Sequence, residues 1–195
     1  MHSTVDVILE QLRKCSQSYH MPSTHISLDE CMMRATGWSP ATYKMPTKPI
    51  KQGFKFRCLA DHSYIWDFHP TSNQVGLDPV PSTDGLTATG EVLYHLLRKL
   101  PGTTYWTVFL DNVYIRVPSF GRLYHDLHMG SCGTARHSSA DFPPELKIPN
   151  HDIGKYEYHA LKALAVKNSL FGQLVGAHLW FNNTPVTILS TVHEF

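Results

Sequence analysis

The feature that most constrains the fold is an apolar run from Tyr105 to Leu110 that stops abruptly at Asp111-Asn112. A short run with almost no polar interruption is typical of a strand buried on both faces of a sheet. Helical patterns lie on both sides of it. Residues 91–100 place their apolar side chains on one face and end at Pro101-Gly102, and residues 117–128 form the second predicted helix. This helix–strand–helix order predicts an α/β fold.

The flanking segments predict further strands around this centre. Residues 4–15 carry an apolar stripe that predicts a short helix. Alternating apolar residues predict strands over 26–33, 54–60, 63–68, 131–135, 157–166, 174–181 and 186–192. The stretches 70–85 and 136–155 are rich in turn residues and are predicted as loops. Early antiparallel strands followed by a β-α-β crossover imply a mixed sheet flanked by helices.

Composition excludes several classes of protein. The 195 residues are 42% apolar and 17% charged, which suits a folded core and not a disordered tail. No stretch approaches the roughly 20 apolar residues of a membrane span, and the N-terminus lacks a secretory layout. The four cysteines lie far apart without a C-x-x-C motif, which argues against a disulfide scaffold or zinc knuckle and suits a reducing compartment.

The net charge of +1 conceals a strongly basic segment. Residues 31–60 contain no acidic residue and carry a charge of +6 from Arg34, Lys44, Lys48, Lys51, Lys55 and Arg57, so the rest of the chain is −5. A local basic segment in a balanced protein indicates a polyanionic partner. The alternative is a basic hairpin that only faces solvent.

Two aspartates are the candidate functional acids. Asp111 ends the apolar strand, where open α/β sheets place their sites, although Asp111 or Asn112 can equally serve as a turn or helix cap. In the predicted strand 26–33, Asp29 points away from the face of Leu28 and Glu30.

Two acids on neighbouring strands would suit a divalent cation. Carboxylates that meet at one sheet edge repel each other unless a cation lies between them, and Mg²⁺ uses one or two carboxylates together with phosphate oxygens. The alternative is that Asp29 and Asp111 are unrelated surface acids.

The pair His125 and His128 lacks a third ligand at suitable spacing, so we expect no metal there.

Several blocks of residues, taken together and in order, resemble the catalytic domain of piggyBac-like transposases, the transposable-element-derived proteins with a DDE active site. The blocks span about residues 24–193. They are Ser27-Leu28-Asp29-Glu30, Gly37, Tyr43, Met45-Pro46, Lys48-Pro49, Lys51, Gly53, Lys55, Leu59-Ala60-Asp61 and Tyr64; Leu110-Asp111-Asn112, Tyr114, Val117-Pro118 and Leu123; Gly133-Thr134-Ala135-Arg136 and Phe142-Pro143; and Trp180, Val186 and Leu189-Ser190-Thr191.

The resemblance implies an RNase H-like mixed sheet flanked by helices, with a β-rich insertion toward the C-terminus. It implies that Asp29 and Asp111 are the first two catalytic aspartates and Mg²⁺ ligands, on adjacent strands. It places the candidate DNA-contacting residues near the DNA: Lys44, Lys48, Lys51, Lys55 and Arg57. The implied chemistry is hydrolysis at transposon ends and strand transfer by a 3′-hydroxyl, both Mg²⁺-dependent phosphoryl transfers.

The chain also departs from the family pattern. The family's third aspartate lies beyond the insertion strands, and Glu194 does not match it. Trp38 replaces the usual arginine after Gly37, and Ile115-Arg116 replace a small hydroxyl pair. We therefore expect a truncated domain that is inactive as this chain and that binds Mg²⁺ weakly or not at all without the third acid.

The expected organisation is an N-terminal helix and linker over 1–23, a partial catalytic core over 24–136, and a loop with the β-rich insertion over 137–195. Transposon-end DNA is the expected partner, a homodimer is a further option, and no membrane partner is expected. Nuclear location follows from the resemblance alone. The alternatives are a non-catalytic DNA- or protein-binding module, a decayed transposon relic, and an interaction domain with an accidental likeness, which predicts that Asp29 and Asp111 lie far apart.

Overall fold

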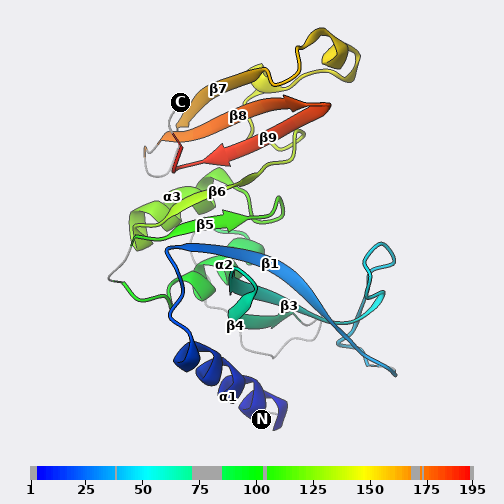
Figure 1. The fold of residues 1–195 in the computed structure, drawn as a ribbon, viewed down its shortest axis with the longest axis vertical. Coiled ribbons are helices and arrows are strands. Elements are labelled where there is room, and N and C mark those ends of the chain that lie inside the picture. Colours follow the sequence, from blue (N-terminus) through cyan, green and yellow to red (C-terminus); the bar gives the residue numbers. More distant parts are fainter. Residues whose placement is uncertain are drawn as a thin grey trace.

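The computed structural model describes residues 4–37, 39–71, 85–102, 105–167, 172 and 174–193. In this part of the chain, one sheet of nine strands forms the body of the molecule (Figure 1). The strand order is β2-β3-β1-β5-β6-β9-β8-β7, with β4 paired to β3. The strands are β1 (His25–Arg34), β2 (Tyr43–Lys44), β3 (Gln52–Asp61), β4 (Tyr64–Thr71), β5 (Thr107–Leu110), β6 (Gly130–Thr134), β7 (Leu161–Lys167), β8 (Leu174–Asn182) and β9 (Thr184–Ser190).

The sheet is mixed, as the sequence predicts. Strand β5 runs parallel to both of its neighbours, β1 and β6, whereas the other pairings are antiparallel. Strands β7 to β9 extend the same sheet beyond β6. The parallel centre needs crossover connections, and the helices between β4, β5 and β6 supply them.

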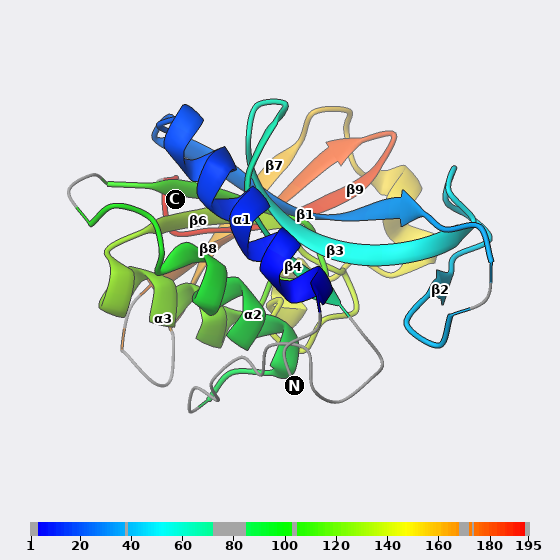
Figure 2. The ribbon, with the colours of Figure 1, turned by 90° about the horizontal axis from the view of Figure 1, so that it is seen from below.

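Two helices pack on one face of this sheet (Figure 2). Helix α2 (Ala88–Leu97) begins after Thr87, whose hydroxyl accepts a hydrogen bond from the Gly90 amide at 3.3 Å. Helix α3 (Val117–Leu127) has Pro118 in its first turn and ends at His128 in the left-handed conformation. The fully buried side chains of Leu93 and Phe120 join the core beneath the central strands. Each such burial contributes about 1.5–3 kcal/mol.

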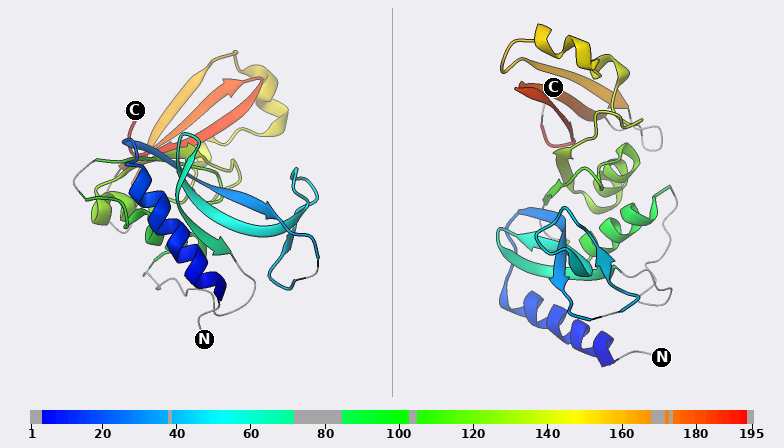
Figure 3. Two further views of the ribbon diagram at one scale, coloured as in Figure 1. Left: turned by 60° about the horizontal axis from the view of Figure 1, so that its bottom comes forward. Right: turned by 90° about the vertical axis from the view of Figure 1, so that its right-hand side faces the viewer.

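Helix α1 (Thr4–Tyr19) packs differently from the prediction (Figure 3). The helix itself is confirmed, but Ile8 and Leu12 of its apolar stripe are 55% and 51% exposed. The helix contacts β4 instead through Arg13, whose Nε donates to the Phe68 carbonyl at 3.0 Å and whose guanidinium lies over the Phe68 ring. The Phe68 carbonyl on the edge strand β4 accepts from the buried Arg13 guanidinium, so polar contacts orient this helix.

Other differences concern element ends and short elements. Strand β5 is not buried on both faces, since Phe109 is 42% exposed. The short strand β2 arises in the proline-rich connector, and 3₁₀ turns at Pro144–Leu146 and Asn150–Lys155 interrupt the predicted loop 136–155. Most of the predicted loop 70–85 lies outside the described residues, as do Trp38 and Glu194. No helix in the described ranges is long and apolar enough to cross a membrane.

The buried Asp61 ties the segment before β1 to the β3–β4 turn. Its carboxylate accepts hydrogen bonds from the Ser23 amide at 2.8 Å and the Ser23 hydroxyl at 2.7 Å, and His20 Nε2 lies 2.8 Å away. These contacts, those of Ser23 first, lower the pKa of Asp61 to about 2. Because the pKa is depressed on folding, the stabilisation is present above the unfolded pKa of about 3.9 and is lost as the pH falls toward 2.

We therefore expect Asp61→Asn to lower the free energy of unfolding at pH 7 by roughly 2 kcal/mol, because charge-assisted hydrogen bonds are lost. The difference from the native chain should shrink as the pH falls from about 4 to 2. Urea denaturation across this pH range measures both effects. Glu157→Gln, at an exposed position, is the matched control. If the difference in unfolding free energy between the two chains does not change with pH, the depressed pKa of Asp61 is contradicted.

Candidate active site

The structure brings Asp29 and Asp111 together. In the parallel pairing of β1 with β5, Leu28 is the register partner of Leu110, and each aspartate is the next residue along its chain. Neighbouring strands lie about 4.8 Å apart, so the two backbones are adjacent where β5 ends. Both residues are exposed. The β1–β5 register does not support the wide separation that the interaction-domain alternative predicted.

The acids lie on the open side of the sheet. Ile26 and Leu28 point into the core beneath the helices and are at most 2% exposed. Side chains alternate along a strand, so Asp29 points to the opposite face. Phe109, two residues before Asp111, is likewise exposed. A large ligand can therefore approach this pair without displacing a helix.

For Asp111, the geometry excludes the helix-cap alternative but agrees with the turn alternative. The Asp111 carbonyl accepts a hydrogen bond from the Tyr114 amide at 3.0 Å, so its main chain closes the turn. The N-cap of α3 is Arg116, whose side chain makes no cap hydrogen bond. On the neighbouring strand, Asp29 Oδ1 accepts from the Glu30 amide at 2.6 Å.

The donor set near the acids is small. Within the described residues there is no cluster of three or more His, Cys, Asp or Glu that could hold a metal ion. His125 instead lies 2.9 Å from Asp126 through its Nδ1. Two exposed carboxylates on adjacent strands still fit Mg²⁺, which commonly takes its other ligands from water and phosphate. They do not fit a site built from protein ligands alone.

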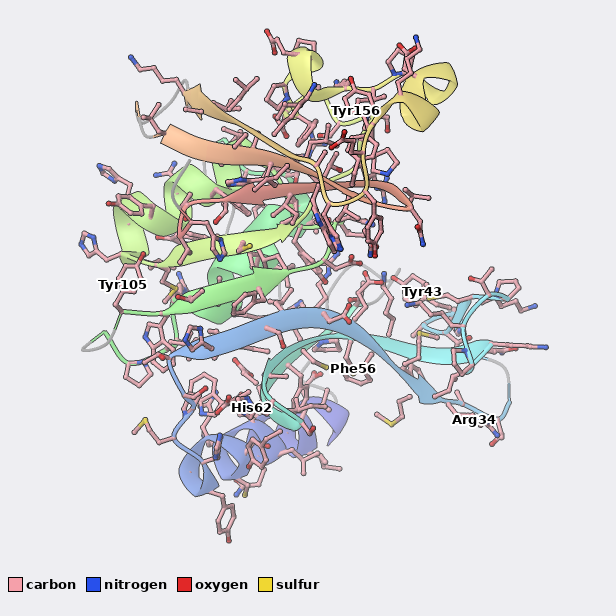
Figure 4. The ribbon with its side chains drawn as sticks, turned by 45° about the horizontal axis from the view of Figure 1, so that its top comes forward. Arg34, Tyr43, Phe56, His62, Tyr105 and Tyr156 are labelled. Atoms are coloured by element: carbon pink, nitrogen blue, oxygen red, sulfur yellow. The ribbon has the colours of Figure 1, made fainter. Side chains whose placement is uncertain are left out.

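A basic arm, defined here as residues 35–51, projects beyond the sheet between β1 and β3 (Figure 1). Tyr43 lies in the arm and Arg34 is the last residue of β1 before it, and both are labelled in Figure 4. The Met45 amide donates to the Lys51 carbonyl at 2.9 Å, which closes the tip. A cavity of about 200 Å³ separates the tip from β1. The exposed basic residues of the arm are Lys44, Lys48 and Lys51.

The other two candidate basic residues have different surroundings. Arg57 is the register partner of Glu30, and Lys55 that of Met32, so both lie on the face opposite Asp29. Lys55 Nζ is 2.7 Å from Glu30 Oε1, and only 16% of its side chain is exposed. The charge of Lys55 is therefore already paired within the protein.

The sequence analysis missed the polar and thiol groups that surround the acids. Burial raises the pKa of the Tyr114 phenol, although the nearby Arg57 charge opposes the shift. Arg136 Nε donates to Asn112 Oδ1 at 3.4 Å, which joins the second and third motif blocks. Burial and a contact with Cys31 raise the pKa of the Cys58 thiol. These partners lie far apart in sequence, so only the folded chain reveals them.

The mixed sheet and its helical layer have the architecture of an RNase H-like domain. A family model described as Transposase IS4 matches residues 2–195, and the chain belongs to this transposase family. The cryo-EM structure of a piggyBac transposase synaptic complex with hairpin DNA aligns with a TM-score of 0.81 and 17% sequence identity. The match covers 99% of this chain and 38% of that chain, so this chain spans well under half of its length.

A search of the curated proteins gives no match. The family match and the shared fold confirm the resemblance drawn from the motifs: this is a transposase-family domain with the fold of piggyBac transposase. The predicted RNase H-like mixed sheet is also confirmed.

Proposed function

We propose that Asp29 and Asp111 are the first two catalytic carboxylates of a piggyBac-like DDE transposase domain. The observation that carries this proposal is the parallel β1–β5 register, which sets the two acids next to each other on the open face. Their match to the family's motif residues and the shared fold support it.

The acids would hold Mg²⁺ at a scissile phosphodiester. When bound, Mg²⁺ stabilises the attacking and leaving oxygens of phosphoryl transfer. Asp29 and Asp111 would hold the ion, and the Asp111–Tyr114 turn keeps one carboxylate at the strand end. The reactions in question are hydrolysis at transposon ends and strand transfer by a 3′-hydroxyl.

DNA is the proposed partner, and the basic arm is its contact surface. Exposed lysines bind backbone phosphates without reading sequence. Lys44, Lys48 and Lys51 are free to do so, whereas Lys55, paired with Glu30, and Arg57, on the opposite face, are proposed to contribute less. The structural relative is a piggyBac transposase synaptic complex with hairpin DNA.

Residues 1–195 taken alone are proposed to bind DNA without cutting it. The described residues contain no group of three or more His, Cys, Asp or Glu that could hold a metal ion, and catalytic groups that act as a unit fail together when one is missing. The domain division at 23/24 and 136/137, a homodimer and nuclear location remain proposals that rest on the resemblance.

We expect residues 1–195 to give no cleavage of transposon-end DNA with Mg²⁺ or Mn²⁺ above the level of the Asp29→Ala variant. A gel assay with end-labelled DNA measures this, and a thermal melt shows that both proteins are folded. Cleavage that depends on Asp29 would show that the third acid is supplied within this chain and would overturn the proposed inactivity.

A non-catalytic DNA-binding module is the second candidate function, favoured by the exposed lysines of the arm. The two functions differ in their need for the acids. Asp29→Asn and Asp111→Asn should abolish Mn²⁺ binding if the first proposal holds, and should leave both DNA and metal binding unchanged if only the second does.

A further inference from the structure

Two cysteines touch each other beside the candidate acids. Cys31 Sγ on β1 and Cys58 Sγ on β3 lie 2.7 Å apart, and both are free thiols. In the antiparallel β1–β3 register, Cys58 is the direct partner of Asp29, and Cys31 is two residues beyond Asp29 on the same strand. Because side chains alternate between the two faces along a strand, both thiols and Asp29 lie on one face of the sheet.

The two thiols differ in access to solvent. Cys31 is partly exposed, whereas Cys58 is 6% exposed. A small oxidant from solvent thus reaches Cys31 first, and the buried Cys58 is the nearest group able to react with the product. The remaining cysteines are separate from this pair: Cys15 lies on α1 and Cys132 on β6.

We propose that Cys31 and Cys58 form a redox-sensitive modification site that a hydroperoxide converts to an intramolecular disulfide. Hydrogen peroxide oxidises the Cys31 thiol to a sulfenic acid and is reduced to water. The Cys58 sulfur then attacks the Cys31 sulfur, the S–O bond breaks, and the hydroxyl leaves as water with the Cys58 proton. The net reaction consumes two thiols and one peroxide and yields one disulfide and two waters.

The disulfide would act on both functional parts of the domain. It links the strands on either side of the basic arm, so residues 32–57 become a closed loop that contains Lys44, Lys48 and Lys51. It also fixes the backbone opposite Asp29, because disulfide geometry restricts the Cβ positions of the two cysteines. This regulatory effect rests on the proposed function of Asp29, whereas disulfide formation does not.

Mass spectrometry of the whole chain tests the modification. The reduced chain is treated with hydrogen peroxide, blocked with N-ethylmaleimide and digested. We expect a cross-linked peptide that joins Cys31 to Cys58, lacks two hydrogens and disappears after dithiothreitol, while Cys132 remains alkylated. Cys31→Ser should abolish the cross-link, and Cys15→Ser should retain it. Overoxidation of Cys31 with Cys58 still alkylated, or a cross-link to Cys15 instead, would overturn the proposal.

Manganese titration followed by electron paramagnetic resonance tests the regulation. We expect the oxidised chain to bind Mn²⁺ roughly tenfold more weakly than the reduced chain, the size of effect that outer-shell changes have on metal sites. Equal binding by the two forms would overturn the regulatory part. Absence of Mn²⁺ binding in both forms would contradict the role of Asp29 and leave the mapped disulfide standing.

Discussion

Replacing Lys44, Lys48 and Lys51 together by glutamine is expected to weaken DNA binding by roughly 10- to 100-fold at low salt. Each lysine that neutralises a phosphate releases a counterion, so the slope of log affinity against log salt should fall by about 3. Fluorescence anisotropy with a labelled duplex, repeated at several salt concentrations, measures both quantities. Scrambling the duplex sequence should change little, because phosphate contacts carry no sequence information.

The matched control is the triple change of Lys155, Lys162 and Lys167 to glutamine. These exposed lysines lie at or near β7, the opposite edge of the sheet, and their removal alters the net charge equally. If both triple variants lose affinity alike, binding depends on overall charge and not on the arm. If the arm variant keeps its affinity, the basic arm does not contact DNA.

Gly133→Ala is expected to have the largest effect on stability. A Cβ at Gly133 would lie 2.0 Å from the Leu110 carbonyl oxygen and 2.6 Å from Ile115 Cδ1. The backbone of β5 must therefore move away from β6. We expect a loss of about 3 kcal/mol, typical of a severe packing conflict, and a fall in Tm of roughly 10 °C.

Gly154→Ala provides the comparison, since a Cβ there meets no atom within 4 Å. Its Tm should stay within about 2 °C of the native value. Differential scanning fluorimetry measures both variants. The conflict involves Leu110, the residue before Asp111. Gly133→Ala should therefore also weaken Mn²⁺ binding by more than the loss of folded protein accounts for. An unchanged Tm for Gly133→Ala would contradict the tight β5–β6 contact.

The sequence predicted the order of the main elements and marked both candidate acids because periodicity and strand ends are local signals. The apolar run before Asp111 and the alternation around Leu28 needed no knowledge of distant residues. The motif blocks added the pairing of the two strands, which periodicity alone left open.

The remaining features depend on which strands become neighbours. Nothing near Lys55 indicates that Glu30 neutralises it, and nothing near Cys31 indicates contact with Cys58. The apolar stripe of α1 gave a wrong prediction of burial for a related reason. Hydrophobic periodicity predicts that the apolar stripe is buried. Arg13 instead donates to the Phe68 carbonyl and lies over the Phe68 ring on β4, and these contacts orient the helix.

The adjacency of β1 and β5 has a consequence for the order of folding. The hairpin of β3 and β4 joins residues close in sequence, whereas Asp29 and Asp111 meet only after a loop of about 80 residues has closed. Non-local parallel pairing of this kind is slow compared with hairpin formation. Asp29 and Asp111 therefore come together in the late steps of refolding, and a partly folded chain forms its basic arm before these two acids meet.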